Sequence, residues 1–229
     1  MDLKVLYEDN HLLAVFKPAG ILSQGDKTGD ISMLDVAKDY IKKKYGKPGQ
    51  VFMGLPHRLD RPVSGCLLMA RTSKAHTRMS NQFRDRLVKK TYLAMTEQPL
   101  SDAQGMMKDM LQKDPLKNRS RVVAGHKGKG REAITKYRLF GKLHNRHLYK
   151  LHPLTGRPHQ LRVQLMSRGA VICGDIKYGS RVEVGRHEIC LHCQELTVEH
   201  PTKKIPIRIT CHPRTNVEWR KFESLIFSI

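Results

Sequence analysis

The sequence is poor in acidic and aromatic residues and has few cysteines. Its 229 residues hold 21 Asp and Glu against 42 Lys and Arg, which gives a formal net charge of +21. A surplus of this size indicates a polyanionic partner, either nucleic acid or an anionic membrane surface. An enzyme with a basic face and no such partner is the remaining alternative. The length allows one large domain or two small ones.

Long hydrophobic runs and targeting signals are also missing. The longest apolar stretches, such as Leu12 to Phe16 and Cys66 to Ala70, are far too short to cross a bilayer. The first residues lack the basic and then apolar profile of a signal peptide. We therefore expect a cytoplasmic protein that does not associate with membranes.

The five cysteines are an odd number without the spacing of a disulfide framework, so we expect reduced thiols. Cys190, His192 and Cys193, followed by Cys211 and His212, superficially offer zinc ligands. Residues 190 and 193 would point to opposite faces of one strand, however, because side chains alternate along a strand. The cysteines are therefore expected to pack in the core, without a metal.

Strands and helices are interspersed along the chain. Apolar patterns predict strands at residues 5–7, 12–16, 66–70, 89–96, 132–140, 189–198 and 205–209. Ser32 and Asp35 resemble a capping box at the start of a helix that ends near residue 46. A second helix carries an apolar stripe, and a third lies within residues 156–169. The stripe of the second helix consists of Ala75, Met79, Phe83 and Leu87.

This mixture predicts an α+β fold with a mixed, mostly antiparallel sheet flanked by helices and loops. No Gly/Ser-rich linker interrupts the chain, so we expect a single domain over residues 1–229. Residues 97–131 lose apolar periodicity and are interpreted as a basic, variable insertion. Its second half is either a solvated loop or a clamp on phosphates. It contains six cations and no acid, namely Lys117, Arg119, Arg121, Lys127, Lys129 and Arg131.

Polar groups concentrate in the loop from Pro56 to Gly65, just before an apolar strand, where reactive groups are often displayed. Asp60 is flanked by Arg58 and Arg61, so its carboxylate is expected to stay ionised and to be held by charge-assisted bonds. Such a carboxylate can act as a nucleophile or a base. Spacing alone also permits a structural ion pair in a turn.

The run His57-Arg58-Leu59-Asp60-x-x-x-Ser64-Gly65 resembles the signature of the RluA-type RNA pseudouridine synthases. Residues 5–20 resemble the opening strand pair and Lys-Pro-x-Gly turn of that family, and residues 90–94 resemble its Lys-x-Tyr-x-Ala strand. Residues 155–163, 174–179 and 191–193 continue the series in order. Val63 departs from the Thr of many members. Because the motifs begin within the first ten residues, we expect the catalytic domain without the family's small N-terminal RNA-binding domain.

The resemblance implies an isomerase that converts uridine in RNA to pseudouridine without a cofactor. It implies that Asp60 is the catalytic carboxylate, attacking either the sugar or the base. Arg58 would help to extrude the target nucleotide, because a stacked base cannot be reached. Tyr92 would stack on the flipped uracil and help to remove the C5 proton. Arg162 would pair with Asp60, and Leu191 would form the aliphatic wall of the pocket.

Each of these roles has a purely structural alternative. Tyr92 can be a buried aromatic, Arg162 a surface cation on a helix, and Leu191 a core residue. His57 and His159 are interpreted as hydrogen-bonding parts of the scaffold.

The expected partner is structured RNA, ribosomal or transfer, and the expected state is a monomer. An inactive RNA-binding or ribosome-assembly factor on the same fold is the alternative function. A hydrolase fits poorly, because sugar hydrolases normally use two carboxylates.

Overall fold

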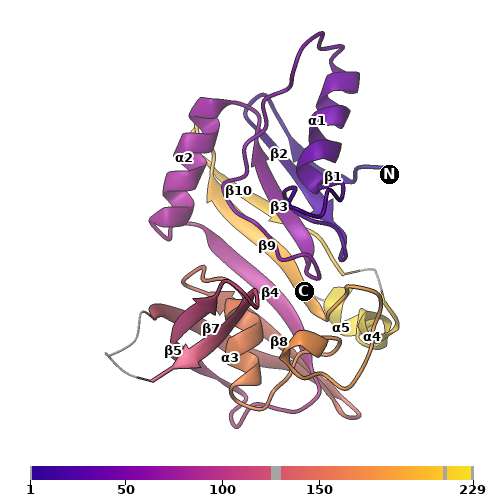
Figure 1. Ribbon diagram of the computed structural model, residues 1–229, viewed down its shortest axis with the longest axis vertical. Helices are drawn as coiled ribbons and strands as arrows, with labels where there is room; N and C mark the ends of the chain where they lie inside the picture. Colours follow the sequence, from indigo (N-terminus) through magenta and orange to yellow (C-terminus); the bar gives the residue numbers. More distant parts are fainter. Residues whose placement is uncertain (1, 125–129, 214–215, 228–229) are drawn as a thin grey trace. The chain divides into compact units, whose positions relative to one another are not determined.

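The computed structural model describes residues 2–124, 130–213 and 216–227, and the chain forms the α+β fold expected from its sequence (Figure 1). It divides into two compact units. Unit 1 comprises Met1–Lys89 and Cys193–Pro213, and unit 2 comprises Lys90–His192 and Arg214–Ile229. The expectation of one catalytic domain over residues 1–229 stays a prediction.

Unit 1 contains the strand order β1-β2-β3-β9-β10, in which β1 pairs with β2, β2 with β3, and β9 with β10 in antiparallel fashion. Every residue of β3 is buried, as expected for an apolar strand in the middle of a sheet. The strands are β1 (Val5–Glu8), β2 (Leu12–Lys17), β3 (Ser64–Ala70), β9 (Leu191–Glu199) and β10 (Pro206–Thr210). Strand β9 begins at Leu191, so the expectation that it starts at residue 189 was wrong by two residues.

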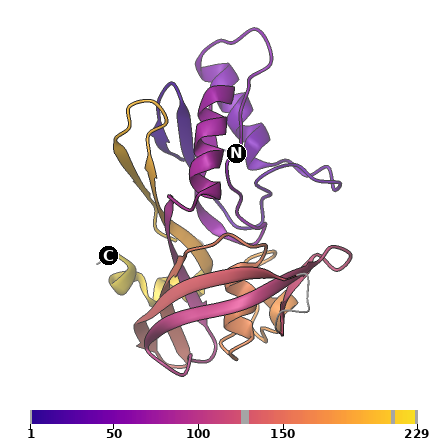
Figure 2. The ribbon, with the colours of Figure 1, turned by 90° about the vertical axis from the view of Figure 1, so that its left-hand side faces the viewer.

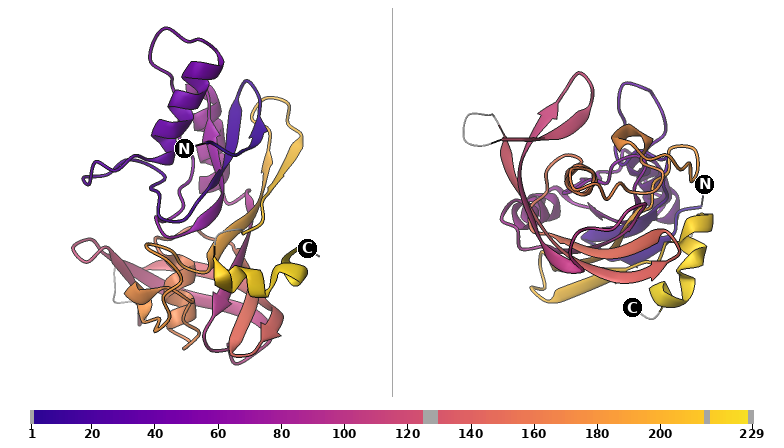
Figure 3. Two further views of the ribbon diagram at one scale, coloured as in Figure 1. Left: turned by 90° about the vertical axis from the view of Figure 1, so that its right-hand side faces the viewer. Right: turned by 90° about the horizontal axis from the view of Figure 1, so that it is seen from below.

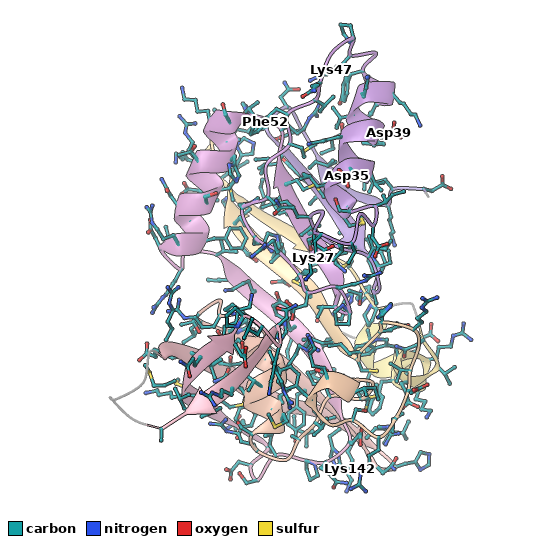
Figure 4. The ribbon with its side chains drawn as sticks, viewed as in Figure 1. Lys27, Asp35, Asp39, Lys47, Phe52 and Lys142 are labelled. Atoms are coloured by element: carbon teal, nitrogen blue, oxygen red, sulfur yellow. The ribbon has the colours of Figure 1, made fainter. Side chains whose placement is uncertain are left out.

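Two helices complete unit 1, α1 (Met33–Lys44) and α2 (Ser73–Arg84). The predicted capping box at the start of α1 is confirmed: the Ser32 side chain accepts the Asp35 N–H, and the Asp35 carboxylate accepts the Ser32 N–H. Asp35 and Asp39 lie one turn apart on this helix in Figure 4. Helix α2 ends before Leu87, which is 68% exposed, so its predicted place in the buried stripe was wrong.

Unit 2 is built on an antiparallel set of strands in the order β4-β8-β7-β5-β6. The short helices α4 and α5 lie beside the end of the β7–β8 hairpin (Figure 3), where the Arg146 Nε of β8 donates to Glu218 of α4 at 3.1 Å. The strands are β4 (Lys89–Thr96), β5 (Gln104–Asp114), β6 (Arg119–Val123), β7 (Arg131–Leu143) and β8 (Arg146–Pro153). The helices are α3 (Gln160–Met166), the 3₁₀ helix η1 (Ile176–Tyr178), α4 (Val217–Lys221) and α5 (Glu223–Phe227).

The predicted basic insertion is regular structure over most of its length. Strands β5 and β6 form a hairpin whose turn projects from the other strands of unit 2 (Figure 2). The Asp114 carboxylate accepts the N–H groups of Leu116 and Lys117 and so shapes the turn. The loop interpretation is therefore wrong for the described part. Lys127 and Lys129 lie outside the described residues.

All five cysteines are buried and free, which confirms that they pack in the core. Over the described ranges, no three His, Cys, Asp or Glu side chains group as metal ligands do. No helix of the described chain is long and apolar enough to cross a membrane.

Candidate active site

The loop that carries Asp60 is held by hydrogen bonds from Lys17, the last residue of β2. Lys17 is completely buried, and its Nζ donates to the carbonyl oxygens of Val63 at 2.8 Å and Arg61 at 3.1 Å. It also donates to the Pro18 carbonyl at 2.9 Å. One ammonium group therefore binds the backbone immediately after Asp60 at two points, which fixes the path of the loop.

The same lysine is electrostatically tied to Asp60. Burial lowers the pKa of Lys17 to about 7, the negative charge of Asp60 opposes this shift, and the positive charge of Arg61 adds to it. Lys17 was not predicted as a site residue. The signal was present in the Lys-Pro-x-Gly turn, which was noted as part of the family resemblance without a role for its lysine.

A second set of contacts holds the loop from the chain that follows β2. The Ser23 hydroxyl donates to the Leu59 carbonyl at 2.7 Å and accepts the Leu59 N–H at 3.1 Å. Gly20 and Arg61 exchange two bonds, Gly20 N–H to the Arg61 carbonyl and Arg61 Nε to the Gly20 carbonyl, each at 2.9 Å. The residues on both sides of Asp60 are thus held by hydrogen bonds to their backbone groups or side chains.

The two flanking arginines differ in what they do. Arg61 Nη1 forms an ion pair with Asp30 at 2.8 Å, so its guanidinium ties the loop to another loop. Asp30 is therefore an acidic partner of Arg61, and the expectation that charge-assisted bonds hold the Asp60 carboxylate stays a prediction. Arg58 is exposed.

His57 and Gly65 frame the loop as parts of the scaffold. The His57 ring stacks on Phe83 with centroids 4.6 Å apart, and its Nε2 accepts the Leu68 N–H at 2.9 Å. This bond agrees with the interpretation of His57 as a hydrogen-bonding scaffold residue. Gly65 has a φ of +127°, and a Cβ there would collide with the backbone of Cys193 in β9. Only glycine fits this position of the motif.

In unit 2 the main charged group is Arg162 on α3. It is 5% exposed, and its Nε and Nη2 donate to the two carboxylate oxygens of Asp175 at 2.7 Å each. A bidentate, buried pair of this kind fixes the plane of the guanidinium. The alternative that Arg162 is a surface cation is therefore wrong. Asp175 was quoted in a motif, but its contact with Arg162 was not foreseen.

The turn before α3 is organised by Gln160, which explains the Thr-Gly-Arg-x-His-Gln motif. The Gln160 Oε1 accepts the Thr155 hydroxyl at 2.8 Å and the Arg157 N–H at 3.0 Å. His159 adopts a left-handed backbone with a φ of +53°, and its Nδ1 lies 2.9 Å from the Tyr178 hydroxyl. These contacts fix the turn that precedes α3, and so they fix the start of the helix that carries Arg162.

The other two predicted site residues belong to unit 2 as well. Tyr92 lies on β4 opposite Leu151 of β8 and is partly exposed. Leu191 is 3% exposed at the start of β9. The structure therefore places Arg58 and Asp60 in unit 1, and Tyr92, Arg162 and Leu191 in unit 2. The pairing of Arg162 with Asp60 and the other assigned roles stay predictions.

Known proteins share both the sequence and the fold. The chain is 35% identical to the "Dual-specificity RNA pseudouridine synthase RluA" of Haemophilus influenzae, over 87% of this chain and 88% of that protein. It is 36% identical to the "Ribosomal large subunit pseudouridine synthase C" of Rickettsia bellii, over 77% of this chain and 56% of that protein. It thus spans only about half of that relative.

Among solved structures, "Human RNA Pseudouridylate Synthase Domain Containing 4" matches with a TM-score of 0.77 and 21% identity, covering 98% of this chain and 93% of the human one. At this identity the likeness concerns the fold alone. The family model described as "RNA pseudouridylate synthase" matches residues 11–167, which include the Asp60 loop, Tyr92 and Arg162. With these matches over most of its length, the chain belongs to the RNA pseudouridylate synthase family.

Proposed function

We propose that this protein isomerises uridine in structured ribosomal or transfer RNA to pseudouridine, with Asp60 as the catalytic carboxylate. Membership of the family makes it an RNA pseudouridine synthase, and the names of its relatives include both a dual-specificity and a ribosomal enzyme. The observation that carries the assignment to Asp60 is the loop itself. Its backbone is held by Lys17, Gly20 and Ser23 on both sides of a single carboxylate.

The reaction begins with extrusion of the target nucleotide, because its C1′ and C5 atoms are inaccessible in a stacked helix. The exposed Arg58 is placed on the loop to enter the RNA and fill the vacated position. Asp60 then attacks the sugar or the base, and the C1′–N1 bond breaks. The rigid backbone of the loop keeps the carboxylate aimed throughout, which supplies orientation without a reorganisation cost.

The second half of the reaction moves the base. The released uracil turns and forms the C1′–C5 bond, and the bond that Asp60 made to the sugar or the base breaks again, which restores the carboxylate. C5 then loses its proton and N1 carries one, so that no atom is gained or lost. Tyr92 stacks on the flipped base and assists the removal of the C5 proton. Arg162, oriented by its bidentate pair with Asp175, supplies the cation that keeps Asp60 anionic. Leu191 closes the apolar side of the pocket.

The RNA is held mainly through its phosphates. A net charge of +21 is the electrostatic footprint expected of a protein that contacts the backbone on both sides of a modified nucleotide. We also propose that the protein works as a monomer in the cytoplasm. Its five free, buried cysteines are consistent with a reducing compartment, and light scattering of the purified protein measures its mass.

The decisive experiment replaces Asp60 by Asn and measures tritium release from RNA labelled at C5 of uridine. Asn keeps the shape and hydrogen bonding of Asp but lacks the anion, so we expect no detectable turnover and nearly unchanged RNA binding. Asp39→Asn is the matched control, because it removes an exposed carboxylate of α1. Activity of Asp60→Asn within about tenfold of wild type, roughly 1.4 kcal/mol of barrier, contradicts the assignment.

Mapping of pseudouridines in cellular RNA with and without the gene identifies the modified position. Loss of a site that wild type restores and Asp60→Asn does not restore supports the enzyme. Restoration by Asp60→Asn instead supports the alternative, an RNA-binding or assembly factor without catalysis.

A further inference from the structure

Tyr178, the last residue of η1, lies between the predicted catalytic arginine and a basic hairpin. Its side chain is 2% exposed. The guanidinium carbon of Arg162 lies 5.0 Å from the centre of the Tyr178 ring, and that of Arg119, the first residue of β6, lies 4.9 Å from the same centre. Two guanidinium groups thus share one aromatic ring, each at a distance typical of a cation–π contact.

The hydroxyl of Tyr178 makes a separate set of contacts. It accepts the Ser120 N–H of β6 at 2.8 Å, and it lies 3.2 Å from the Ser120 carbonyl and 2.9 Å from Nδ1 of His159. The Ser120 side chain in turn donates to the Pro158 carbonyl at 2.7 Å. The β5–β6 hairpin is therefore fastened, through the phenol, to the turn that leads into α3.

A further contact joins the same elements next to the ring. The Lys177 Nζ donates to the Asn118 carbonyl in the turn of the hairpin at 3.1 Å. The hairpin carries the exposed cations Lys113, Lys117, Arg119 and Arg121. Phosphates that bind these side chains pull on an element that contacts Tyr178 next to its turn.

Core packing alone does not require this arrangement. The Tyr178 ring belongs to an apolar cluster with Leu111, Ala133 and Val163, and a phenylalanine ring fills the same space. The hydroxyl and the two guanidinium contacts come in addition to that packing. Tyr149, by comparison, is a buried tyrosine of the same unit whose hydroxyl accepts one backbone N–H, from Leu100 at 2.8 Å.

We propose that Tyr178 is a positioning residue of the isomerase, whose ring holds the Arg162 guanidinium while its hydroxyl holds the β5–β6 hairpin, so that RNA bound by the hairpin is aligned with Arg162. The inference rests on the proposed function, because it assigns Arg162 to the reaction. It adds that binding of RNA and placement of the catalytic cation depend on one side chain. The ring and the hydroxyl serve different steps and can be separated by substitution.

The test measures kcat and KM for tritium release from C5-labelled ribosomal and transfer RNA of cells that lack the gene. Tyr178→Phe keeps the ring and loses the contacts of the hydroxyl with Ser120 and His159. We therefore expect KM to rise about fivefold or more at nearly constant kcat, since one hydrogen bond accounts for about fivefold. Tyr178→Leu also loses the ring, so kcat is expected to fall about tenfold or more. Tyr149→Phe, the matched control, leaves both constants at the wild-type values.

Arg119→Gln provides a second variant, because it removes a cation of the hairpin and its contact with the Tyr178 ring but leaves the bond between the Tyr178 hydroxyl and Ser120 in place. Its effect on KM and that of Tyr178→Phe are expected to be less than additive in the double variant, since both loosen the same contact. Circular dichroism shows whether Tyr178→Leu folds. If it does not, the double-mutant comparison of Tyr178→Phe with Arg119→Gln still tests the proposal.

Two results overturn the inference: a wild-type KM for Tyr178→Phe, or full additivity with Arg119→Gln. An inactive wild-type protein contradicts the proposed function instead.

Discussion

At the scale of single residues, Lys17 is the side chain whose chemistry differs most from its ordinary form. A lysine ammonium is normally solvated, whereas this one is buried and surrounded by three backbone carbonyl oxygens. The carbonyls replace water as acceptors, and the nearby charge of Asp60 favours the ammonium form. Lys17 therefore links the stability of unit 1 to the geometry of the Asp60 loop.

This environment predicts a pH dependence of stability. The pKa of Lys17 is lowered from 10.5 to about 7 on folding. Between these values the unfolded chain binds a proton that the folded protein does not, so the free energy of unfolding rises with pH across this window. Below pH 7 both states are protonated and the contribution no longer changes. Lys17→Met removes the titrating group, and urea unfolding from pH 7 to pH 10 is expected to show a smaller rise than in wild type.

Comparison with Lys42→Met, an exposed lysine of α1, separates the effect of burial from the loss of one charge. Equal pH dependence in wild type and Lys17→Met would contradict the prediction. At neutral pH the Lys17→Met protein also lacks the bonds to Arg61 and Val63, so we expect lower isomerase activity.

The order of short motifs was sufficient to select Asp60, Tyr92, Arg162, Arg58 and Leu191 as candidates. It did not reveal their partners, because partners are set by tertiary contacts. Arg162 and Asp175 are separated by 13 residues and meet only once α3 and η1 pack together. Arg61 pairs with Asp30 for the same reason, although Asp60 is its neighbour in sequence.

At the scale of elements, local signals determined what could be predicted. Helix α1 carries its own start signal in Ser32 and Asp35, and both hydrogen bonds of the capping box are present. The β5–β6 hairpin has no comparable signal. Its apolar residues Met106, Met107, Met110 and Leu111 come in adjacent pairs instead of alternating, and most of its side chains are exposed. Pairing with β7, not the local pattern, makes β5 a strand.

The hairpin gives a prediction about RNA binding. Replacing Lys113, Lys117 and Arg121 by Gln removes three exposed cations without touching the Tyr178 contacts. Each lost phosphate contact is expected to reduce the slope of log affinity against log salt by about one. Fluorescence anisotropy with structured RNA at several salt concentrations measures that slope.

The control for the hairpin variant removes the same amount of charge elsewhere, at Lys42, Lys47 and Lys142, the last two of which are labelled in Figure 4. An unchanged slope in the hairpin variant, or an equal change in the control, means that the hairpin does not contact phosphates. The parallel pair Lys127→Gln and Lys129→Gln tests the original interpretation of the whole basic stretch, although these two residues lie outside the described chain.

At the scale of the whole molecule, the α+β class followed from the sequence. Segments whose apolar residues alternate, as in strands, are interspersed with segments whose apolar residues recur at every fourth position, as in helices. The division into two units did not, because no linker marks it. Two of the three passages between the units lie inside strands, after Lys89 in β4 and after His192 in β9, and the third follows Pro213. A boundary within regular structure leaves no Gly- or Ser-rich trace in the sequence.

The net charge of +21 predicts that salt has opposite effects on folding and on RNA binding. In the free protein the surplus cations repel one another, so screening by salt is expected to raise the free energy of unfolding. In the complex the same cations replace counterions on the RNA. About five phosphate contacts give a slope of log affinity against log salt near −4, which is roughly a 250-fold loss of affinity between 50 and 200 mM salt. Thermal unfolding and anisotropy in the same buffers measure both effects.

Parallel series in potassium chloride and potassium glutamate distinguish screening from binding of a particular anion, because screening depends on ionic strength alone. A midpoint of unfolding that falls with salt in both series would show that paired charges, such as Arg162 with Asp175, outweigh the repulsion among unpaired ones. A flat affinity would show that the surplus lies away from the RNA. A midpoint of unfolding that rises with salt, together with an affinity for RNA that falls steeply, is the result expected if the cations that repel one another in the free protein are those that bind the RNA phosphates.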